Sequence, residues 1–202
     1  MVCRLSQKQL SFYIFLIVIV LRIISFEIFL AGGRPEFQVD SDDDYRGILN
    51  TIKNIDAVAG ITAGDPEMIT RLIEETKSSG GRDILSFNSV RPPASETAGV
   101  TRACRMAAET GARIHFRQIS CADSIEVLRE YLDADNISAE VTPHNLVLTE
   151  EHAIRLGPFG AVIPPLRMDT DCNALLEALQ PGEIDIVAAD PAPRLREERE
   201  RG

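Results

Sequence analysis

The sequence predicts an α/β fold with a largely parallel β-sheet. Short apolar runs alternate along the chain with amphipathic stretches of helical length, which is the pattern of repeated β-α units. Hydrophobic residues make up 45% of the 202 residues and charged residues 26%, as in an ordinary globular domain and unlike a disordered chain. The length suits one domain but falls short of the roughly 250 residues of a complete eight-stranded α/β barrel.

The first segment, residues 1–22, stands apart in composition. It contains ten consecutive apolar residues, Phe12–Leu21, after a basic start, as a signal peptide does. A membrane span needs about 20 apolar residues, and this run is shorter. The charged residue Arg22 follows it directly. We therefore favour a buried or non-native apolar segment. A membrane anchor through residues 12–21 and a frameshift product remain alternatives.

The next part of the chain supplies the predicted strands and helices in alternation. The predicted strands are the short apolar segments Ile23–Leu30, Ala57–Thr62, Arg113–Ser120, Ile137–Thr142, Gly160–Ile163 and Ile184–Ala189. The predicted helices are the amphipathic segments Tyr45–Ile55, Pro66–Ser78, Glu96–Thr110, Ala122–Leu132, Thr149–Leu156 and Cys172–Leu179. Asp65 before Pro66 is a typical helix start, and so is Thr149 before two glutamates. The charged tail, residues 194–202, is predicted to be a solvated end.

Charge and cysteine content exclude several classes of protein. Acidic residues outnumber Lys and Arg by 31 to 21, and a net charge of −10 argues against nucleic-acid binding. The four cysteines contain no CxxC pair, so we expect neither a zinc knuckle nor a disulfide framework, and Cys104 and Cys121 are predicted to be packing residues. The acidic residues Asp40 and Asp42–Asp44 lack the spacing of a calcium loop and are predicted to flank a helix N-terminus.

Chemistry in parallel α/β folds is concentrated at the carboxyl ends of the strands. The polar residues at or just after the predicted strand ends are therefore the candidate site residues. They are Glu27, Thr62, Gln118, His144 and Asp190.

Three segments in the second half of the chain carry a family resemblance. Their sequences are EVTPHNLVLT (Glu140–Thr149), GPFGAVIPPLR (Gly157–Arg167) and GEIDIVAADPAP (Gly182–Pro193). In this order and spacing they resemble the C-terminal third of dihydroorotase and of its cyclic-amidohydrolase relatives, allantoinase and hydantoinase. Weaker matches extend upstream, so the resemblance covers residues 23–193 and leaves residues 1–22 outside it.

The resemblance implies a fold and an activity. The implied fold is a partial metal-dependent-hydrolase (β/α) barrel of the TIM type, truncated at its N-terminus to roughly the C-terminal five β-α units. The implied activity is hydrolysis of a cyclic amide C–N bond, as in pyrimidine biosynthesis. In such a reaction a divalent metal, usually zinc, polarises the carbonyl and lowers the pKa of a bound water, while a carboxylate moves the proton.

The resemblance implies a role for individual residues that stand at the family's metal-site positions. His144 matches a metal-binding histidine, and Asp190 matches an aspartate that is both metal ligand and general acid/base. Glu27 stands where the family has a carboxylated lysine that bridges two metals, and Gln118 stands where it has a metal-binding histidine. The family's HxH motif on the first strand would lie upstream of Met1, and no HxH occurs in this chain.

The surviving ligands are fewer than the three that a catalytic zinc site usually takes. His144 and Asp190 could hold one metal weakly, with Gln118 or water completing the shell; the alternative is that no metal binds. Glu27 is too short to replace the lysine carbamate and is predicted to be exposed. His115, three residues before Gln118, is predicted to face the other side of the strand.

The leading hypothesis is a diverged dihydroorotase-like amidohydrolase with lost or weak activity as an isolated chain. The alternative is a non-catalytic subunit that assembles with an active amidohydrolase or a carbamoyltransferase, or with itself, because an open barrel exposes sheet edges. The expected substrate is a small cyclic amide or ureide, and the expected location is the cytoplasm. Membrane association through residues 12–21 is a minor alternative.

Overall fold

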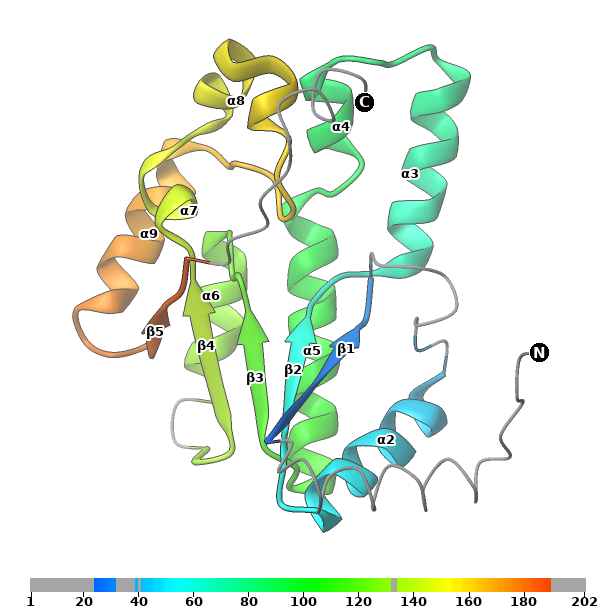
Figure 1. Cartoon of the computed structure of the whole chain (residues 1–202), viewed down its shortest axis with the longest axis vertical. Helices are drawn as coiled ribbons and strands as arrows, with labels where there is room; N and C mark the ends of the chain where they lie inside the picture. Colours follow the sequence, from blue (N-terminus) through cyan, green and yellow to red (C-terminus); the bar gives the residue numbers. More distant parts are fainter. Residues whose placement is uncertain (1–23, 32–38, 40, 132–133, 190–202) are drawn as a thin grey trace.

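The computed structural model describes residues 24–31, 39, 41–131 and 134–189. These residues contain one five-stranded parallel sheet in which each strand lies beside the next along the chain, in the order β1-β2-β3-β4-β5 (Figure 1). The strands are β1 (Ser25–Phe29), β2 (Val58–Thr62), β3 (Ile114–Arg117), β4 (Ile137–Val141) and β5 (Ile186–Val187). Parallel strands in sequential order, joined by helices, are the arrangement of a barrel wall, so the predicted fold class is confirmed.

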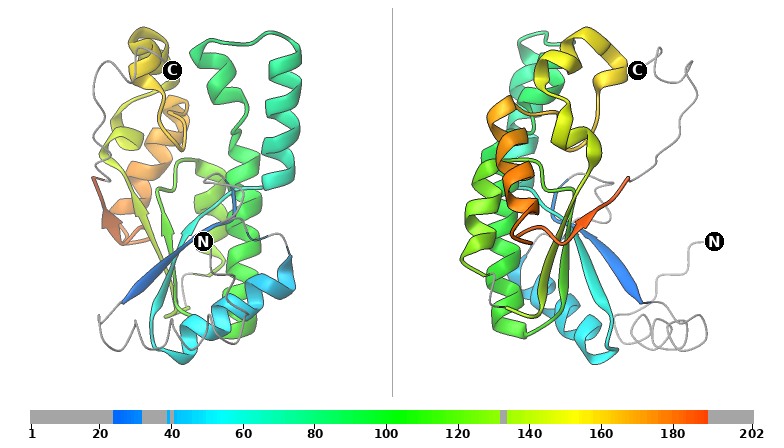
Figure 2. Two further views of the ribbon diagram at one scale, coloured as in Figure 1. Left: turned by 45° about the vertical axis from the view of Figure 1, so that its right-hand side comes forward. Right: turned by 90° about the vertical axis from the view of Figure 1, so that its left-hand side faces the viewer.

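The helices divide into two groups. Helices α5 (Pro93–Thr110), α6 (Ala122–Arg129) and α9 (Asp169–Leu179) lie on one face of the sheet (Figure 2), and α2 (Asp42–Asn54) packs against α5. The other helices gather at the carboxyl ends of the strands (Figure 1): α3 (Pro66–Ser78), α4 (Ile84–Ser89), α7 (Pro143–Val147), α8 (Glu150–Leu156) and the 3-10 turn η2 (Gly157–Gly160). The second group surrounds the edge at which ligands bind in parallel sheets.

The core lies between the sheet and the first group of helices. Ile114 and Phe116 of β3 are buried in one cluster with Val100 and Met106 of α5. Successive strand residues point to opposite faces, so His115 and Arg117, which alternate with the buried pair, lie on the face away from these helices. Both are half-buried.

Helix starts follow the capping signals in the sequence. The Asp65 carboxylate accepts a hydrogen bond from the Met68 backbone N–H at 2.9 Å, and Pro66 is the first residue of α3. Thr149 caps α8 in a capping box with His152. The acidic cluster begins α2, where Asp42 pairs with Arg102 at 2.8 Å. The predicted roles of these three starts are confirmed; Asp40 lies outside the described residues.

One predicted strand is wrong, and two helices were not predicted. Gly160–Ile163 contains the end of η2 followed by irregular chain, because Gly157 at φ +55° and Pro158 start a tight turn. Helices α4 and α7 have six and five residues. Such segments are too short to show a helical period in the sequence.

The terminal predictions fall outside the described residues. These are the apolar segment of residues 1–22, Asp190 and the charged tail of residues 194–202, together with the domain boundaries drawn at them. Within the described ranges no helix has the length and apolar character needed to cross a bilayer.

Helix α5 touches the turn after β2 at very close range. A Cβ atom placed on Gly99 would lie 2.1 Å from the backbone nitrogen of Gly64 and 2.8 Å from its Cα. Backbone atoms cannot move aside as the end of a flexible side chain can, so only glycine fits at position 99. This contact holds the start of α5 against the carboxyl end of the sheet.

Gly99→Ala is expected to lower the free energy of unfolding by about 1–3 kcal/mol, the usual cost of forcing a methyl group into a filled core. The matched control is Gly47→Ala in α2, where a Cβ meets no atom within 4 Å. That change should stabilise the helix by about 0.5–1 kcal/mol. Urea unfolding followed by circular dichroism measures both, and equal effects of the two changes would contradict the proposed contact.

Candidate functional site

A small cleft lies at the carboxyl end of the sheet, beside β2 and β3. Its volume is about 40 Å³, enough for a water molecule or a small chemical group. The lining includes Thr62 at the end of β2, Arg117 and Gln118 at the end of β3, and Ile163–Pro165 from the loop after η2. Arg91, Glu96 and Arg167 complete its polar lining.

An ion pair crosses β2 next to this cleft. The Arg117 guanidinium lies 2.6 Å from Oε1 of Glu27, and the Thr62 hydroxyl donates to the same oxygen at 3.0 Å. Glu27 lies opposite Gly60 in the register of β1 and β2. A Cβ on Gly60 would lie 3.6 Å from the Arg117 side chain, an ordinary contact distance, so the Arg117 side chain passes directly over Gly60 on its way to Glu27.

The same face of the sheet continues the polar ladder into β4. Arg117 Nε lies 3.8 Å from Glu140 Oε1, and the other Glu140 oxygen lies 3.2 Å from His115 Nε2. His115 Nδ1 is in turn 2.8 Å from the Ser138 hydroxyl. Arg117 therefore lies between two carboxylates, those of Glu27 and Glu140.

Two sequence predictions concern this face. Glu27 is exposed, as predicted, but its carboxylate is bound by Arg117 and Thr62 rather than left in solvent. The sequence analysis compares His115 with Gln118 by strand alternation, but Gln118 is not part of the strand. Strand β3 ends at Arg117, and Gln118 has a φ of +56°. Strand alternation does not extend to such a residue, and Gln118 lines the cleft.

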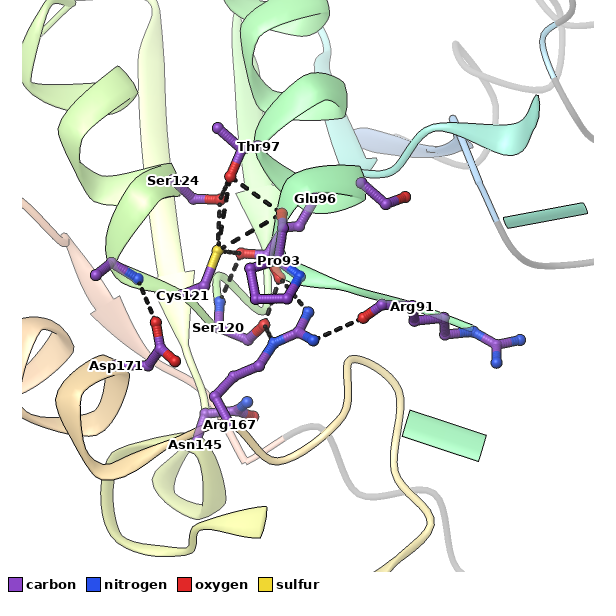
Figure 3. A network of polar contacts seen from close by, with 12 residues as sticks. Arg91, Pro93, Glu96, Thr97, Ser120, Cys121, Ser124, Asn145, Arg167 and Asp171 are labelled. Carbon is purple, nitrogen blue, oxygen red and sulfur yellow. Dashed lines mark hydrogen bonds and ion pairs between the residues drawn. The ribbon is translucent and has the colours of Figure 1, made fainter. Parts of the chain in front are cut away.

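A second, buried network forms one wall of the cleft (Figure 3). The Arg167 guanidinium donates to Ser120 Oγ at 3.0 Å and to the Arg91 carbonyl at 2.6 Å, and it lies 3.3 Å from Glu96 Oε2. The Ser120 backbone N–H donates to the other Glu96 oxygen at 2.9 Å, and the Ser120 hydroxyl also donates to Glu96. Arg167 and Glu96 are 7% and 5% exposed. The network joins the loop after η2 to the start of α5 and the end of β3.

The thiols near this network are packing groups. Cys121 is fully buried, with its sulfur 3.1 Å from Ser124 Oγ and 3.4 Å from Glu96 Oε1. Burial, and then the Glu96 charge, raises the pKa of the Cys121 thiol to about 12. Burial likewise raises the pKa of Cys104 to about 12. A thiol that stays protonated at neutral pH is a poor nucleophile, so the predicted packing role of both cysteines fits these surroundings.

His144 lies on α7, beyond the end of β4. Its Nε2 is 3.0 Å from the Thr142 hydroxyl oxygen, and that hydroxyl donates to Asn145 Oδ1 at 2.6 Å. The Thr142 hydroxyl thus links the His144 ring to the Asn145 side chain. Asp190, the second predicted ligand, lies outside the described residues.

The described residues do not fit the zinc site that the family resemblance implies. Nowhere in the described ranges do three His, Cys, Asp or Glu side chains gather as a metal site, whereas a catalytic zinc usually takes three protein ligands. Glu27, at the position of the bridging lysine, is neutralised by Arg117. Gln118 offers an amide in place of an imidazole.

Three arginines of the site were missed as site residues by the sequence reasoning. The sequence analysis names Arg167 only as the end of a motif and does not name Arg91 or Arg117. A signal for Arg117 does exist: polar residues at alternate positions of β3 and β4 indicate a polar sheet face. The partners of the three arginines depend on contacts distant in sequence, which no local pattern contains.

Comparison with known proteins gives consistent results. No family model matches the chain. It is 32% identical over 173 residues to a dihydroorotase of Halobacterium salinarum, covering 86% of this chain and 39% of that protein. It is 31% identical over 175 residues to an allantoinase of Bacillus velezensis, covering 84% of this chain and 38% of that protein. The chain thus spans about two fifths of the length of these relatives.

Solved structures show the same fold. The chain superposes on a dihydropyrimidinase from Brevibacillus agri with a TM-score of 0.85 at 22% identity, over 95% of this chain and 42% of that one. A dihydroorotase from Saccharomyces cerevisiae gives a TM-score of 0.71 at 14% identity. At these identities the likeness establishes the fold alone.

Arg167→Gln is expected to lower the free energy of unfolding by about 3–5 kcal/mol, because it leaves the buried Glu96 charge without its partner. Arg129→Gln is the control. Arg129 also pairs with two glutamates, but its side chain is 38% exposed, so we expect a loss below about 1 kcal/mol. Urea unfolding measures both values, and a loss below 1 kcal/mol for Arg167→Gln would contradict the structural role of the network.

Proposed function

Because the chain belongs to the dihydroorotase-like family of cyclic amidohydrolases, we propose that it retains part of the amidohydrolase barrel but has weak or no ring-opening activity of its own. The proposed ancestral substrate class is a small cyclic amide or ureide, and the proposed setting is the cytoplasm. The unpaired, buried cysteines of the described residues support a reducing compartment. One observation carries the proposal: the carboxylate at the metal-bridging position is bound to an arginine.

The ion pair competes directly with a metal ion. At 2.6 Å the Arg117 guanidinium neutralises Glu27, and Thr62 uses a further lone pair of the same oxygen. A divalent cation would have to displace Arg117 and would then lie beside an arginine charge. Two like charges a few ångströms apart repel strongly at a partly buried site. This repulsion supports weak metal affinity.

His144 and Asp190 remain the proposed residual metal ligands, and Asp190 the proposed general acid/base. When bound, a zinc ion would supply positive charge to polarise an amide carbonyl and to acidify water. Two protein ligands rarely hold zinc tightly. We therefore expect any metal bound in this way to exchange readily.

The test is zinc content and turnover of the purified 202-residue chain. We expect less than one zinc per chain by atomic absorption after dialysis, and dihydroorotate hydrolysis no faster than the background. One tightly bound zinc, together with turnover that Asp190→Asn abolishes and Asp169→Asn leaves intact, would refute the proposal. A catalytically active dihydroorotase assayed in parallel shows that the conditions support hydrolysis.

A pair of variants tests whether the ion pair between Arg117 and Glu27 is the cause of weak zinc affinity. Arg117→Gln removes the cation beside Glu27, so zinc affinity should rise relative to the unaltered chain. Arg113→Gln, directly before the same strand, removes an exposed arginine that pairs with Asp56 and should leave zinc affinity unchanged.

A second candidate function, a non-catalytic subunit, is favoured by the outer strands of the sheet. In the described sheet β1 and β5 each pair with one neighbouring strand. Ile186 and Val187 of β5 are 47% and 49% exposed. An apolar edge strand with free backbone groups can pair with another chain, such as a second copy, an active amidohydrolase or a carbamoyltransferase.

Val187→Lys is therefore expected to reduce assembly, because lysine on an edge strand opposes pairing. Sedimentation equilibrium of the purified chain, alone and with an active amidohydrolase, measures the association. The control is Val147→Lys, since Val147 is 65% exposed but belongs to α7 and not to a strand. A chain that stays monomeric at high micromolar concentration and binds neither partner would contradict the subunit function.

A further inference from the structure

Three polar side chains on the sheet face away from α5 form a relay that the proposed function leaves unused. They are Ser138 and Glu140 of β4 and His115 of the neighbouring strand β3 (Figure 1). The His115 ring lies between the other two: Nδ1 is 2.8 Å from the Ser138 hydroxyl oxygen, and Nε2 is 3.2 Å from Glu140 Oε2. A hydroxyl, an imidazole and a carboxylate in this order are the parts of a serine nucleophile with its base.

Strand register produces this order. His115 lies directly opposite Ser138 in the parallel pairing of β3 and β4, and Glu140 follows two residues later on the same face. The imidazole therefore has a hydroxyl on one side and a carboxylate on the other. The His115 and Glu140 side chains are 18% and 11% exposed, and Ser138 is half-buried. The relay is thus partly accessible from solvent.

The two ring nitrogens of His115 have different roles. An ionised carboxylate only accepts hydrogen bonds, so the Nε2 proton points to Glu140, and Nδ1 of the neutral ring accepts the Ser138 proton. The Ile114 carbonyl is also near this hydroxyl but is more distant, at 3.4 Å. On its other side Glu140 faces a positive charge, because Arg117 Nε lies 3.8 Å from its second oxygen. Glu140 is therefore the positioning residue, which fixes the tautomer that leaves Nδ1 able to take a proton.

A second contact between a hydroxyl and an imidazole lacks this order. The Thr149 hydroxyl lies 2.9 Å from His152 Nδ1, but the same nitrogen accepts the Thr149 backbone N–H at 3.1 Å. A ring nitrogen has one lone pair, and a lone pair used by a backbone N–H does not take up the proton of a hydroxyl. Thr149 is therefore a reference for a hydroxyl that touches histidine without being activated.

We propose that Ser138 is a nucleophile that small activated esters acylate, with His115 as its general base. The Ser138 oxygen forms a bond to the acyl carbon, and the bond from that carbon to the leaving oxygen breaks, with its electron pair staying on the oxygen. The hydroxyl proton moves to Nδ1 of His115, which later releases it to the leaving oxygen or to water. The half-buried position of Ser138 restricts the acyl group to a small one. This reaction needs neither a metal ion nor the ring-amide chemistry proposed above.

The experiment treats the full chain with 4-nitrophenyl acetate and locates acetyl groups by peptide mass spectrometry after an acid quench. We expect Ser138 to be acetylated faster than Ser25, although Ser25 is the more exposed of the two and lies on the same sheet face. Thr149 should stay unmodified. The exposed amine of Lys77 is the internal reference for reagent and time.

Variants test the base and the positioning residue. His115→Gln keeps a planar polar side chain without a base, and it should slow acetylation of Ser138 about a hundredfold relative to Lys77, a usual contribution of a general base. Glu140→Gln keeps an acceptor for the Nε2 proton and should slow it less than Glu140→Ala does. The matched control is His152→Gln, which should leave the rate at Ser138 unchanged. Circular dichroism confirms the fold of each variant.

Three results would overturn the proposal. The first, seen in the unaltered chain and so independent of how any variant folds, is acetylation of Ser138 no faster than that of Ser25. The second is a rate at Ser138 that His115→Gln leaves unchanged or that His152→Gln lowers equally. The third is acetylation of Thr149 as fast as that of Ser138, which would show that the carboxylate of the relay has no role.

Discussion

The buried contact between Arg167 and Glu96 determines the shape of the carboxyl end of this fold. Removing two charges from water is costly, and the cost is recovered only where hydrogen bonds saturate both groups. Here Ser120 contacts both side chains and the Arg91 carbonyl accepts from the guanidinium. Three segments distant in sequence are thereby fixed to one another. Because the Arg91 carbonyl is one of the acceptors, the same contact also fixes the chain that enters α5.

The two faces of the sheet follow different constraints. Toward α5 the strands present apolar residues such as Ile114 and Phe116, and a packed interior tolerates little change there. The other face carries the polar ladder of Glu27, Arg117 and Glu140. Ion pairs on this face depend on strand register rather than on tight packing. A chain can therefore keep the barrel framework while the chemistry of this face diverges.

Much of the fold could be predicted from the sequence, because alternation and capping are local properties. The start of α3 at Pro66 needs only Asp65 beside it. The loop after η2 could not be predicted, since a short apolar run before Pro164 reads equally well as a strand. The site was less predictable than the fold. Glu27 and Arg117 are 90 positions apart, and their contact depends on strand register; Gln118 left the strand pattern because its backbone turned to positive φ.

Electrostatics supports the proposed weak metal binding of the cleft. A metal site of the implied kind gathers carboxylates and imidazoles, whose lone pairs attract a cation. The described lining of this cleft instead contains three arginines and one glutamate. The carboxylates of Glu96, Glu27 and Glu140 equal these arginines in number, so this region is close to neutral although the whole chain carries a net charge of −10. The Glu27 carboxylate is already engaged in an ion pair, and a divalent cation would gain it only by displacing Arg117. The divergence of this face therefore lies in the partner of Glu27 rather than in the framework of the sheet.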